Sequence, residues 1–517
     1  MSNNNTKKKL SIRRLFILFA LVILSCYAVY MYIKANEGIN KYYDLKPWYG
    51  AYVDVTAKPL YGFEKVDAAS NHKNVILSFI VASKNDPCEP TWGTYYTLDD
   101  ANNELDLDRR IARFRQLGGE ISVSFGGLLN EELALVCKDE EKLLSAYKKV
   151  ISRYQVNTLD FDLEGNALLD QESLERRARV VSKLQRQEDN KMLAVWLTLP
   201  VATFGLTEEG AFALEIMLKN NVDVTGVNIM TMNFGNSKSE HESMFSAAKR
   251  SVIEAHRQLG VIYNKFGITL GSNTLWKKIG LTVMIGQNDI PKEIFTLDDA
   301  KSINHFAKEK GVSRVSIWSA NRDSACGDNY VNLRIVSDSC SGIKQEKHEF
   351  SKILSDGFAN KLESNLAQVT LSETVEDIID NPNESPYPIW NEKAVYLEGS
   401  KVVWRKNVYK AKWWTKGDLP DNPVLHSWQT PWELLGPVLP GEKPVSLPKL
   451  PENYYPEWDG KKIYNKLDRV MYEGEAYQAK WWTQGDSPEA SKFDPDSSPW
   501  RALSVSEIEE ILQSLKN

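Results

Sequence analysis

The sequence predicts an α/β protein: a (β/α)8 barrel of the TIM type, followed by two small β-rich modules and preceded by an N-terminal transmembrane or signal segment. Eight apolar, β-rich runs alternate with amphipathic segments in the first two thirds of the chain. The last quarter holds 10 of the 15 Trp residues and repeats itself at an offset of 68 residues. Such apolar runs are typical of parallel strands buried on both faces, and eight of them fit a closed barrel better than an open sheet.

The composition is that of a globular protein. The chain has 517 residues, of which 42% are hydrophobic and 26% charged, and its net charge is −6. These values exclude wholesale disorder, and the acidic balance argues against nucleic acid as a partner, because phosphate binding needs a basic face. No C-x-x-C pair is present, which disfavours a zinc site, and we expect neither a metal nor a cofactor.

Residues 1–36 are predicted to be a signal anchor or signal peptide. Five Lys and Arg residues precede an apolar run of 19 residues at positions 15–33. At about 1.5 Å per residue this run would span roughly one hydrocarbon core, and the basic cluster places the N-terminus in the cytoplasm. A lipoprotein signal ending at Cys26 and cleaved export are alternatives. We therefore expect an exported protein, anchored in a membrane with the rest of the chain outside the cytoplasm, or secreted if the segment is cleaved.

Four further cysteines predict disulfide bonds in an oxidising compartment. Cys88, Cys137, Cys326 and Cys340 allow three pairings. A bond between Cys326 and Cys340 would close a short loop and leave Cys88 to pair with Cys137. Four buried free thiols are the alternative.

The barrel is expected over residues 45–342, with one strand at each apolar run. The expected strands are 48–55, 75–82, 119–125, 158–164, 193–200, 224–234, 279–286 and 312–318, and helical patterns occupy 99–116, 139–153, 168–187, 206–219, 239–264 and 297–310. No G-x-G-x-x-G follows the first run, which disfavours a dinucleotide-binding sheet. Residues 343–380 are polar and helix-prone, and a linker is predicted over 343–386.

Two copies of one module follow the linker. The expected modules are 387–437 and 455–503, joined by a Pro-rich linker over 438–454 and followed by a tail over 504–517. Residues 411–418 (AKWWTKGD) recur as 479–486 (AKWWTQGD) without a gap in register. A core is marginal at about 50 residues, so Trp must supply much of the burial, and Trp390, Trp432, Trp458 and Trp500 are expected in the cores.

The fourth expected strand carries three acids on one face. Side chains alternate along a strand, so Asp160, Asp162 and Glu164 share the face that points into the barrel. Carboxylates this close cannot all ionise freely, so at least one pKa should rise, which is the setting for a general acid at neutral pH. Glu164 lies nearest the C-terminal mouth, where barrel enzymes perform their chemistry. A solvated edge strand is the alternative, but a closed barrel has no edge.

This segment resembles the D-x-x-D-x-D-x-E signature of family 18 glycoside hydrolases, the chitinase family, with Asn157 at the first position. Further residues carry the same resemblance over about 48–340. Ser124 to Gly127 (SFGG) is similar to the S-x-G-G motif of the family, and Met230 to Phe234 (MTMNF) is similar to its strand-six motif. Trp318 stands where the family places the indole under the −1 sugar, and residues 284–289 with 318–323 look like a bacterial chitinase-D-type branch.

The resemblance implies a retaining, substrate-assisted hydrolysis of chitin. Glu164 would protonate the glycosidic oxygen, Asp162 would orient the acetamido group, and Asp160 would take up or share a proton with Asp162. The Tyr that many members carry in the strand-six motif is missing here. The implied substrate contacts are Trp318, Met230, Met232, Gly126 and Gly127, together with Asn233, Gln287 or Asn288 in place of the Tyr.

The repeated modules resemble the family 5/12 carbohydrate-binding modules of chitinases. The resemblance implies sugar platforms on Trp413 and Trp414 and on Trp481 and Trp482. Adjacent residues of a strand point to opposite faces, so one indole of each pair is expected to be exposed. Chitin or N-acetylglucosamine oligomers are the expected partners of a monomer. The alternatives are a non-catalytic chitin-binding lectin or adhesin, and an endo-β-N-acetylglucosaminidase acting on glycoprotein glycans.

Overall fold

The computed structural model describes residues 46–65, 73–187, 193–328, 335–362, 378–444, 448–492 and 497–515. The chain divides into two compact units, one up to Val375 and one from Glu376 onward. The predicted N-terminal segment, residues 1–36, lies outside the described residues. Among the helices that are described, none has the length and hydrophobicity that a membrane span requires.

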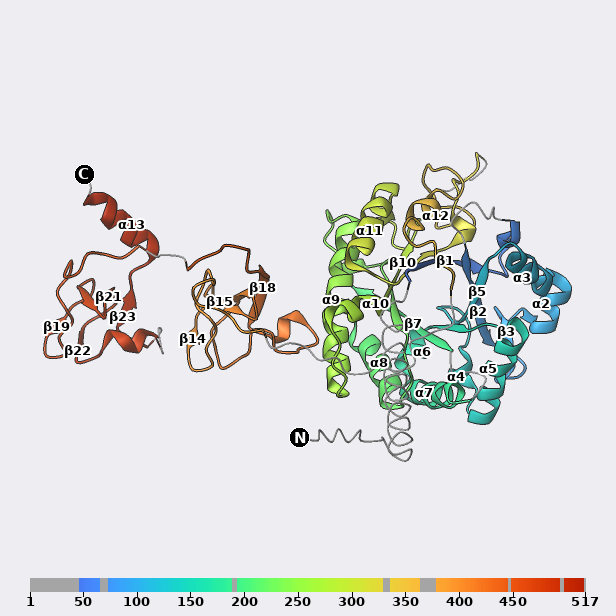
Figure 1. Cartoon of the computed structure of the whole chain (residues 1–517), viewed down its shortest axis with the longest axis horizontal. Coiled ribbons are helices and arrows are strands. Elements are labelled where there is room, and N and C mark those ends of the chain that lie inside the picture. Colours follow the sequence, from blue (N-terminus) through green and yellow to red (C-terminus); the bar gives the residue numbers. More distant parts are fainter. Residues whose placement is uncertain are drawn as a thin grey trace, which may run out of the picture. The chain divides into compact units, whose positions relative to one another are not determined.

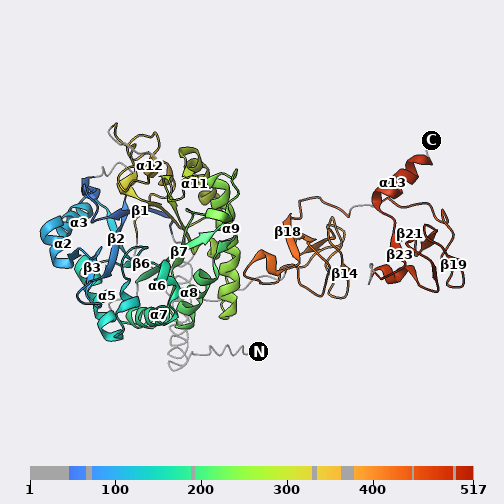
Figure 2. The same ribbon diagram turned by 180° about the vertical axis from the view of Figure 1, so that it is seen from behind.

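The first unit is a closed barrel of eight parallel strands, as predicted (Figures 1 and 2). The first strand pairs with both the second and the last, which closes the cylinder. Each strand lies within or across one of the eight predicted apolar runs. The strands are β1 (Trp48–Asp54), β2 (Asn74–Ala82), β5 (Glu120–Gly126), β6 (Thr158–Asp162), β7 (Ala194–Ala202), β9 (Gly226–Met230), β10 (Ile279–Met284) and β13 (Arg314–Trp318).

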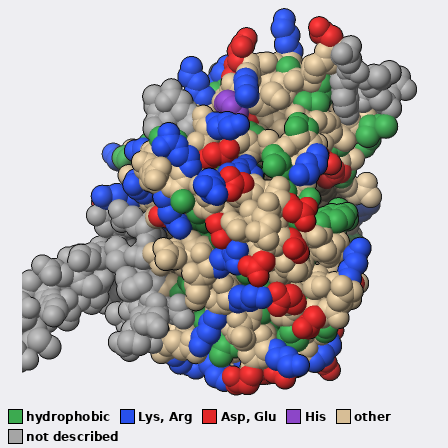
Figure 3. All heavy atoms as spheres, turned by 90° about the vertical axis from the view of Figure 1, so that its right-hand side faces the viewer, with side chains coloured by type: hydrophobic (Ala, Val, Ile, Leu, Met, Phe, Trp, Pro, Cys, Tyr) green, Lys and Arg blue, Asp and Glu red, His purple; other side chains and the backbone are tan. Residues whose placement is uncertain are grey.

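Helices cover the outer face of this barrel (Figure 1). The larger ones are α2 (Leu98–Leu105), α3 (Leu107–Gln116), α5 (Glu140–Tyr154), α7 (Gln171–Gln185), α8 (Glu208–Lys219), α9 (Met244–Lys265) and α11 (Leu297–Lys310). The predicted helical segment 99–116 is split into α2 and α3, because Asp106 between them has a left-handed backbone with φ 52°. Acidic and basic side chains mix on the face in Figure 3, and Arg153 of α5 forms ion pairs with Asp99 and Asp108 of α2 and α3.

Short elements complete the unit. They are α4 (Leu133–Val136), α6 (Gly165–Leu169), α10 (Ser272–Lys277), β3 (Pro90–Trp92), β4 (Tyr96–Thr97), β8 (Gly205–Leu206), β11 (Gly286–Gln287) and β12 (Ile294–Phe295). Disulfide bonds join Cys88 to Cys137 and Cys326 to Cys340. The prediction of disulfides is therefore confirmed, and the alternative of four free thiols is wrong.

The barrel unit continues beyond the predicted boundary at residue 342. Helix α12 (Glu349–Leu354) contacts α11 and buries Phe350 and Leu354. Farther on, Ala359 forms a β-bridge with Trp48, and the Asn360 side chain donates to the Pro47 carbonyl. Residues 349–362, which the sequence assigned to a linker, are thus packed on the barrel, because a few apolar side chains in a polar stretch are enough to dock it.

The second unit contains the two predicted modules. Each has a three-stranded antiparallel sheet and a two-stranded ribbon. The sheets are β15 (Lys401–Trp404), β16 (Asn407–Ala411) and β18 (Trp432–Pro437) in module 1, and β20 (Arg469–Tyr472), β21 (Glu475–Ala479) and β23 (Trp500–Ala502) in module 2. The ribbons are β14 (Val395–Tyr396) with β17 (Thr415–Lys416), and β19 (Ile463–Tyr464) with β22 (Thr483–Gln484).

The duplication extends to the cores of the modules. The core of module 1 consists of Tyr396, Val402, Tyr409, Ala411 and Trp432, and that of module 2 of Tyr464, Val470, Tyr477, Ala479 and Trp500, each at the same offset of 68. Trp390 and Trp458 are partly buried against these clusters. The four Trp residues predicted as core therefore lie in or against the cores.

The predicted C-terminal tail forms a helix, α13 (Val505–Ser514). Its Ile508, Ile511 and Leu512 side chains pack on a buried cluster that includes Met471 and Leu503 of module 2. A capping box between Ser504 and Glu507 starts the helix. The segment is therefore part of the module fold and not a free extension.

Candidate active site

Strand β6 carries the carboxylates into the barrel. It lies between β5 and β7, and its Phe161 packs outward against Phe125 and against Tyr147 of α5. The alternating side chains Asp160 and Asp162 therefore face the interior, where 0% and 4% of their surfaces are exposed. Glu164 follows the strand with an extended backbone as the residue before α6, and it is half-buried.

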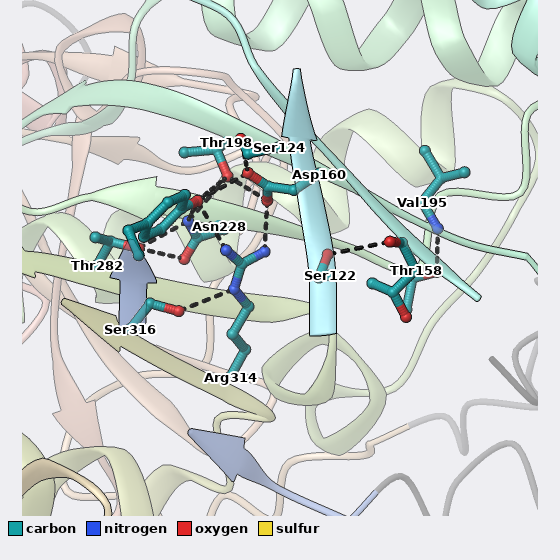
Figure 4. Close-up of polar contacts among 12 residues, drawn as sticks. Ser122, Ser124, Thr158, Asp160, Val195, Thr198, Asn228, Thr282, Arg314 and Ser316 are labelled. Atoms are coloured by element: carbon teal, nitrogen blue, oxygen red, sulfur yellow. Dashed lines mark hydrogen bonds and ion pairs between the residues drawn. The ribbon is translucent and has the colours of Figure 1, made fainter. Parts of the chain in front are cut away.

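The innermost acid, Asp160, is fully hydrogen-bonded. Its two carboxylate oxygens accept from Tyr52 Oη at 2.8 Å, Ser124 Oγ at 2.7 Å, Thr198 Oγ1 at 2.7 Å and Arg314 Nη1 at 2.6 Å. Figure 4 shows three of these labelled donors meeting at Asp160 from different strands. Asn228 extends the network by donating to Thr198 and to Thr282. Asp160 thus belongs to a buried polar network, here called the polar floor of the barrel, whose members are Tyr52, Ser124, Asp160, Thr198, Asn228, Thr282 and Arg314.

Arg314, at the start of β13, is the charged partner in this floor. Its guanidinium is buried and lies 5.2 Å from the Trp48 ring centre, 5.2 Å from that of Trp196 and 5.6 Å from that of Tyr52. It also donates to Tyr52 Oη at 2.8 Å. The sequence did not single out this residue, because a lone Arg in an apolar strand looks like a surface position.

The second acid, Asp162, has a different environment. It is buried, and its Oδ1 atom has no hydrogen-bond partner among the described residues. Burial raises the pKa of Asp162 well above its ordinary value, the negative charges of Glu164 and Asp160 raise it further, and Arg314 opposes them. Asp162 is therefore held in a setting that favours its protonated form.

The outermost acid, Glu164, is tuned to neutral pH. Burial and then the charge of Asp289 raise the pKa of Glu164 to about 7, against a lowering effect from the backbone N–H of Leu128. A carboxyl group with this pKa can donate a proton and take it back at neutral pH. This agrees with the sequence-based expectation that at least one of the three pKa values rises.

Two glycines make room for the carboxylate strand. Gly126 has φ 103°, and a Cβ atom there would lie 2.2 Å from the Asp162 carbonyl oxygen. Gly127 has φ 82°, faces the Phe79 ring, and donates its N–H to the same carbonyl at 3.0 Å. Both were predicted as substrate contacts; in the structure Gly126 gives the Asp162 backbone room and Gly127 bonds it.

Aromatic side chains lie beside the acids. Trp318 ends β13, is half-buried and stacks on Phe79 with ring centres 5.5 Å apart. Its ring centre lies 6.1 Å from that of Tyr52, whose hydroxyl bonds Asp160. The structure therefore places Trp318 beside Tyr52, a hydrogen-bond partner of the carboxylate row.

The strand-six motif places Asn233 in a polar pair that the sequence did not predict. Met230 is 8% exposed, and Met232 and Asn233 are half-buried. Asn233 Nδ2 donates to Asp289 Oδ2 at 2.7 Å, and the Asp289 N–H donates back to Asn233 Oδ1 at 3.0 Å. Asp289 was missed, although it directly follows two residues that were considered.

The other two candidates to replace the missing Tyr, Asn288 and Gln287, are buried and form hydrogen bonds within the protein. Asn288 is fully buried, and its side-chain amide donates to the carbonyls of Met284 and Gly286. Gln287 is 7% exposed, and its main-chain carbonyl accepts from Arg322 Nη2 at 2.6 Å. Of the three alternatives left open by the sequence, Asn233 has the most accessible side chain beside the acids.

Both indoles of each Trp pair are exposed. Trp413 and Trp414 are 45% and 53% exposed, and Trp481 and Trp482 are 45% and 59% exposed. The expectation of one exposed indole per pair is wrong, because the pairs lie in bends after β16 and β21 and do not alternate as strand residues do. Lys412 and Lys480 lie over the Trp413 and Trp481 rings, with Nζ 4.7 and 4.4 Å from the ring centres.

Comparison with known proteins identifies relatives of both units. Residues 457–501 match the model of carbohydrate-binding module family 5/12. A probable bifunctional chitinase/lysozyme of Escherichia coli (strain K12) is 32% identical over 332 residues, which cover 62% of this chain and 35% of that protein. Endochitinase 11 of Metarhizium anisopliae is 31% identical over 299 residues, which cover 56% of this chain and 55% of that protein. The chain thus spans about a third and about half of these two relatives.

A solved structure gives the same picture for the fold. The catalytic domain of the hyperthermophilic chitinase from Pyrococcus furiosus is 26% identical, with a TM-score of 0.53, and the match covers 61% of this chain and 97% of that chain. The resemblance to chitinases and to family 5/12 modules is confirmed. The family match covers module 2, and module 1 is assigned by its repeat and its fold.

Proposed function

We propose that this chain is a glycoside hydrolase that cleaves the β-1,4 linkages of chitin. The observation that carries the proposal is the inward row of Asp160, Asp162 and Glu164, in which the outermost carboxyl has a pKa of about 7. A row of this kind at the mouth of a parallel barrel suits general acid catalysis, and the chitinases among the relatives support the substrate class.

In the proposed reaction Glu164 is the general acid and then the general base. It protonates the glycosidic oxygen while the acetamido carbonyl of the substrate attacks the anomeric carbon, and an oxazolinium ion forms as the bond to the leaving sugar breaks. Glu164 then takes a proton from a water molecule that attacks the anomeric carbon. The bond between that carbon and the acetamido oxygen breaks, which restores the acetamido group and leaves the sugar with retained configuration. No enzyme nucleophile is needed.

Asp162 orients the acetamido group. Its buried Oδ1 has no hydrogen-bond partner among the described residues, so it can accept from the acetamido N–H of a bound sugar. When the exchangeable proton of the pair lies on Glu164, Asp162 is ionised, and its negative charge then stabilises the positive charge that develops on the oxazolinium ring. A buried acceptor without a partner in the chain is thus explained by a partner in the substrate.

The neighbouring residues position the sugar. Trp318 offers its ring as the floor of the −1 site, because stacking on Phe79 fixes the indole. The amide of Asn233 supplies a polar contact where many family members have a Tyr, and its bond to Asp289 sets its orientation. The exposed indoles of the two modules would bind chitin and raise the local substrate concentration by tethering.

We also propose that the chain is exported. The two disulfide bonds are expected in an oxidising compartment, and the basic and apolar pattern of residues 1–36 fits an anchor or signal. Protease protection of the barrel in intact cells, lost after the membrane is opened, would contradict export.

Product analysis of wild type and Glu164→Gln tests the catalytic proposal. With a chromogenic chitotriose glycoside and with insoluble chitin, we expect Glu164→Gln to lower kcat by about 10²- to 10⁴-fold. NMR of the first product should show the β-anomer, because configuration is retained. The circular dichroism spectrum should be unchanged in the variant, which is the control for folding of the barrel.

The remaining outcomes identify the rivals. Chitin binding without turnover in wild type indicates a lectin or adhesin. Release of glycans from a glycoprotein without cleavage of chitin indicates an endo-β-N-acetylglucosaminidase. Equal activity of wild type and Glu164→Gln would refute the assigned acid.

A further inference from the structure

The barrel interior beneath Asp162 and Glu164 contains a buried positive charge, Arg314, which takes no part in the proposed reaction. Arg314 and Asp160 form an ion pair at 2.6 Å with 1% and 0% of their side chains exposed, although 154 residues separate them in sequence. Burying two charges is costly unless both are fully hydrogen-bonded, and here they are held in place by bonds from four strands. A buried ion pair adds little to the stability of a fold compared with apolar side chains of the same volume, which points to a role for this pair in the site.

We propose that Arg314 is a positioning residue: it holds Asp160 as a fixed anion beneath Asp162, so that the exchangeable proton of the site stays between Asp162 and Glu164. This inference rests on the proposed function. It differs from the sequence-based expectation, in which Asp160 takes up or shares a proton with Asp162.

The hydrogen bonds of Asp160 support this assignment. An ionised carboxylate accepts about four hydrogen bonds, and Asp160 receives four, including a charged one from Arg314. A proton on Asp160 would have to displace one of these donors and would leave the buried guanidinium without its counter-charge. Asp162 lacks a partner for Oδ1 and can carry the proton at no such cost.

The charges around the Asp162–Glu164 pair predict how it responds. The titratable groups that face it among the described residues are Asp160 on β6, Tyr52 on β1, Arg314 on β13 and Asp289 after β11. Removal of the Asp160 charge alone leaves Arg314 positive, which favours loss of the proton from the pair. Removal of both charges, that of Asp160 and that of Arg314, returns the proton affinity of the Asp162–Glu164 pair toward its wild-type value.

The test compares pH profiles of kcat/KM for wild type, Asp160→Asn and the double variant Asp160→Asn/Arg314→Met on a soluble chitotriose glycoside. We expect the basic limb to move to lower pH in Asp160→Asn and to return toward the wild-type position in the double variant. Arg314→Lys keeps the positive charge but loses the two contacts of the guanidinium with Asp160 and Tyr52. The basic limb of its pH profile should therefore stay in place, while kcat falls and KM changes little. The double variant buries no lone charge, so its fold should be retained.

A second buried pair serves as the control. Arg177 and Glu132 lie 2.6 Å apart with 0% and 1% of their side chains exposed. Arg177→Lys should lower the unfolding temperature without moving the limb. Coincident limbs in all variants, or an equal shift in Arg177→Lys, would overturn the inference while leaving the proposed function intact, whereas an inactive wild type would overturn both.

An independent observation concerns the surface of module 1. Trp428 lies on the short helix Ser427–Gln429 and is 54% exposed. One face of its indole stacks on the ring of the buried His426, with centres 4.3 Å apart and an angle of 4° between the planes. Lys412 links it to the Trp pair, because its Nζ lies over the Trp413 ring and donates to the Ser427 carbonyl at 2.5 Å.

From this arrangement we infer that Trp428 is a third sugar-stacking position of module 1, at a place where the sequence of module 2 has no Trp. A flat indole backed by another ring offers a rigid apolar surface to the C–H face of a pyranose, the ligand class proposed for Trp413 and Trp414. At the repeat offset of 68, Trp428 corresponds to Asp496. Module 1 should therefore contact a longer run of N-acetylglucosamine units than module 2.

Binding to insoluble chitin tests this inference, which also rests on the proposed function. The full chain carries Glu164→Gln to prevent hydrolysis and Trp481→Ala/Trp482→Ala to disable module 2. In this background we expect Trp428→Ala to weaken binding about three- to tenfold, and Trp428→Phe to retain most of it. The control is Leu434→Ala, at another exposed apolar side chain of module 1, which should leave binding unchanged.

Trp413→Ala/Trp414→Ala in the same background separates the two proposals. If that variant loses binding while Trp428→Ala keeps it in full, only the third stacking position is overturned. Full binding in all variants overturns the sugar-binding role of the module itself.

Discussion

Two carboxylates two residues apart on one strand have opposite surroundings. Asp160 accepts four hydrogen bonds, one of them from a buried guanidinium, and belongs to a closed network. Asp162, one step nearer the mouth, has an oxygen with no partner among the described residues and a raised pKa. The floor of the barrel is thus satisfied by the protein, whereas the mouth is left for a ligand to complete. The difference separates the structural end of the acidic row from its chemical end.

Among the substitutions that test this contrast between Asp160 and Asp162, Asp162→Asn should have the largest effect on kcat. The variant keeps the shape but loses the charge that we propose stabilises the oxazolinium ion, so kcat should fall about 10²- to 10³-fold. The folded chain should become more stable at neutral pH. The pKa of Asp162 is raised on folding, so its contribution to stability is complete below the pKa of the unfolded chain and is lost as pH rises.

Unfolding temperature and kcat measured on the same samples check both parts. A loss of stability together with the loss of activity would show that Asp162 supports the fold in the way Asp160 does. Asp160→Asn is the matched comparison, and it should be the less stable of the two because it leaves Arg314 buried without a counter-charge.

The pH dependence should sharpen the position of the chemical end. The pKa of Glu164 is about 7, so kcat/KM should fall by about tenfold per pH unit above that value, as the acid loses its proton. The same raised pKa gives stability that is full below the ordinary pKa of a Glu and is lost as pH rises through 7. The unfolding temperature of wild type should therefore drop more between about pH 5 and about pH 8 than that of Glu164→Gln. Parallel pH curves of unfolding for the two chains would contradict the assigned pKa.

The sequence predicted what depends on local pattern. The apolar runs fixed the eight strands, alternation placed Asp160 and Asp162 inside, and the repeat defined two modules with matching cores. It did not predict Arg314 as a partner of Asp160, because only closure of the barrel brings β13 across from β6. Asp289 was given no role for the same reason. The packing of α12, in a stretch that the sequence marked as helix-prone, and the helix α13 were not predicted, because their few apolar residues gain meaning only from the surfaces on which they pack.

Thr198→Val should have the smallest effect and so tests how redundant the floor is. The change removes one of four donors to Asp160, but the other three, including Arg314, remain, and Asn228 keeps its bond to Thr282. We expect a loss of about 1.5–3 kcal/mol in the free energy of unfolding, as for a hydrogen bond to a charged group, and kcat within about threefold of wild type. Thr91→Val, which removes a buried hydroxyl that donates to the Val81 carbonyl and not to an acid, is the control and should cost about 1 kcal/mol. A large fall in kcat for Thr198→Val alone would mean that each donor to Asp160 is needed for the chemistry, and that the floor and the mouth of the barrel act as one unit.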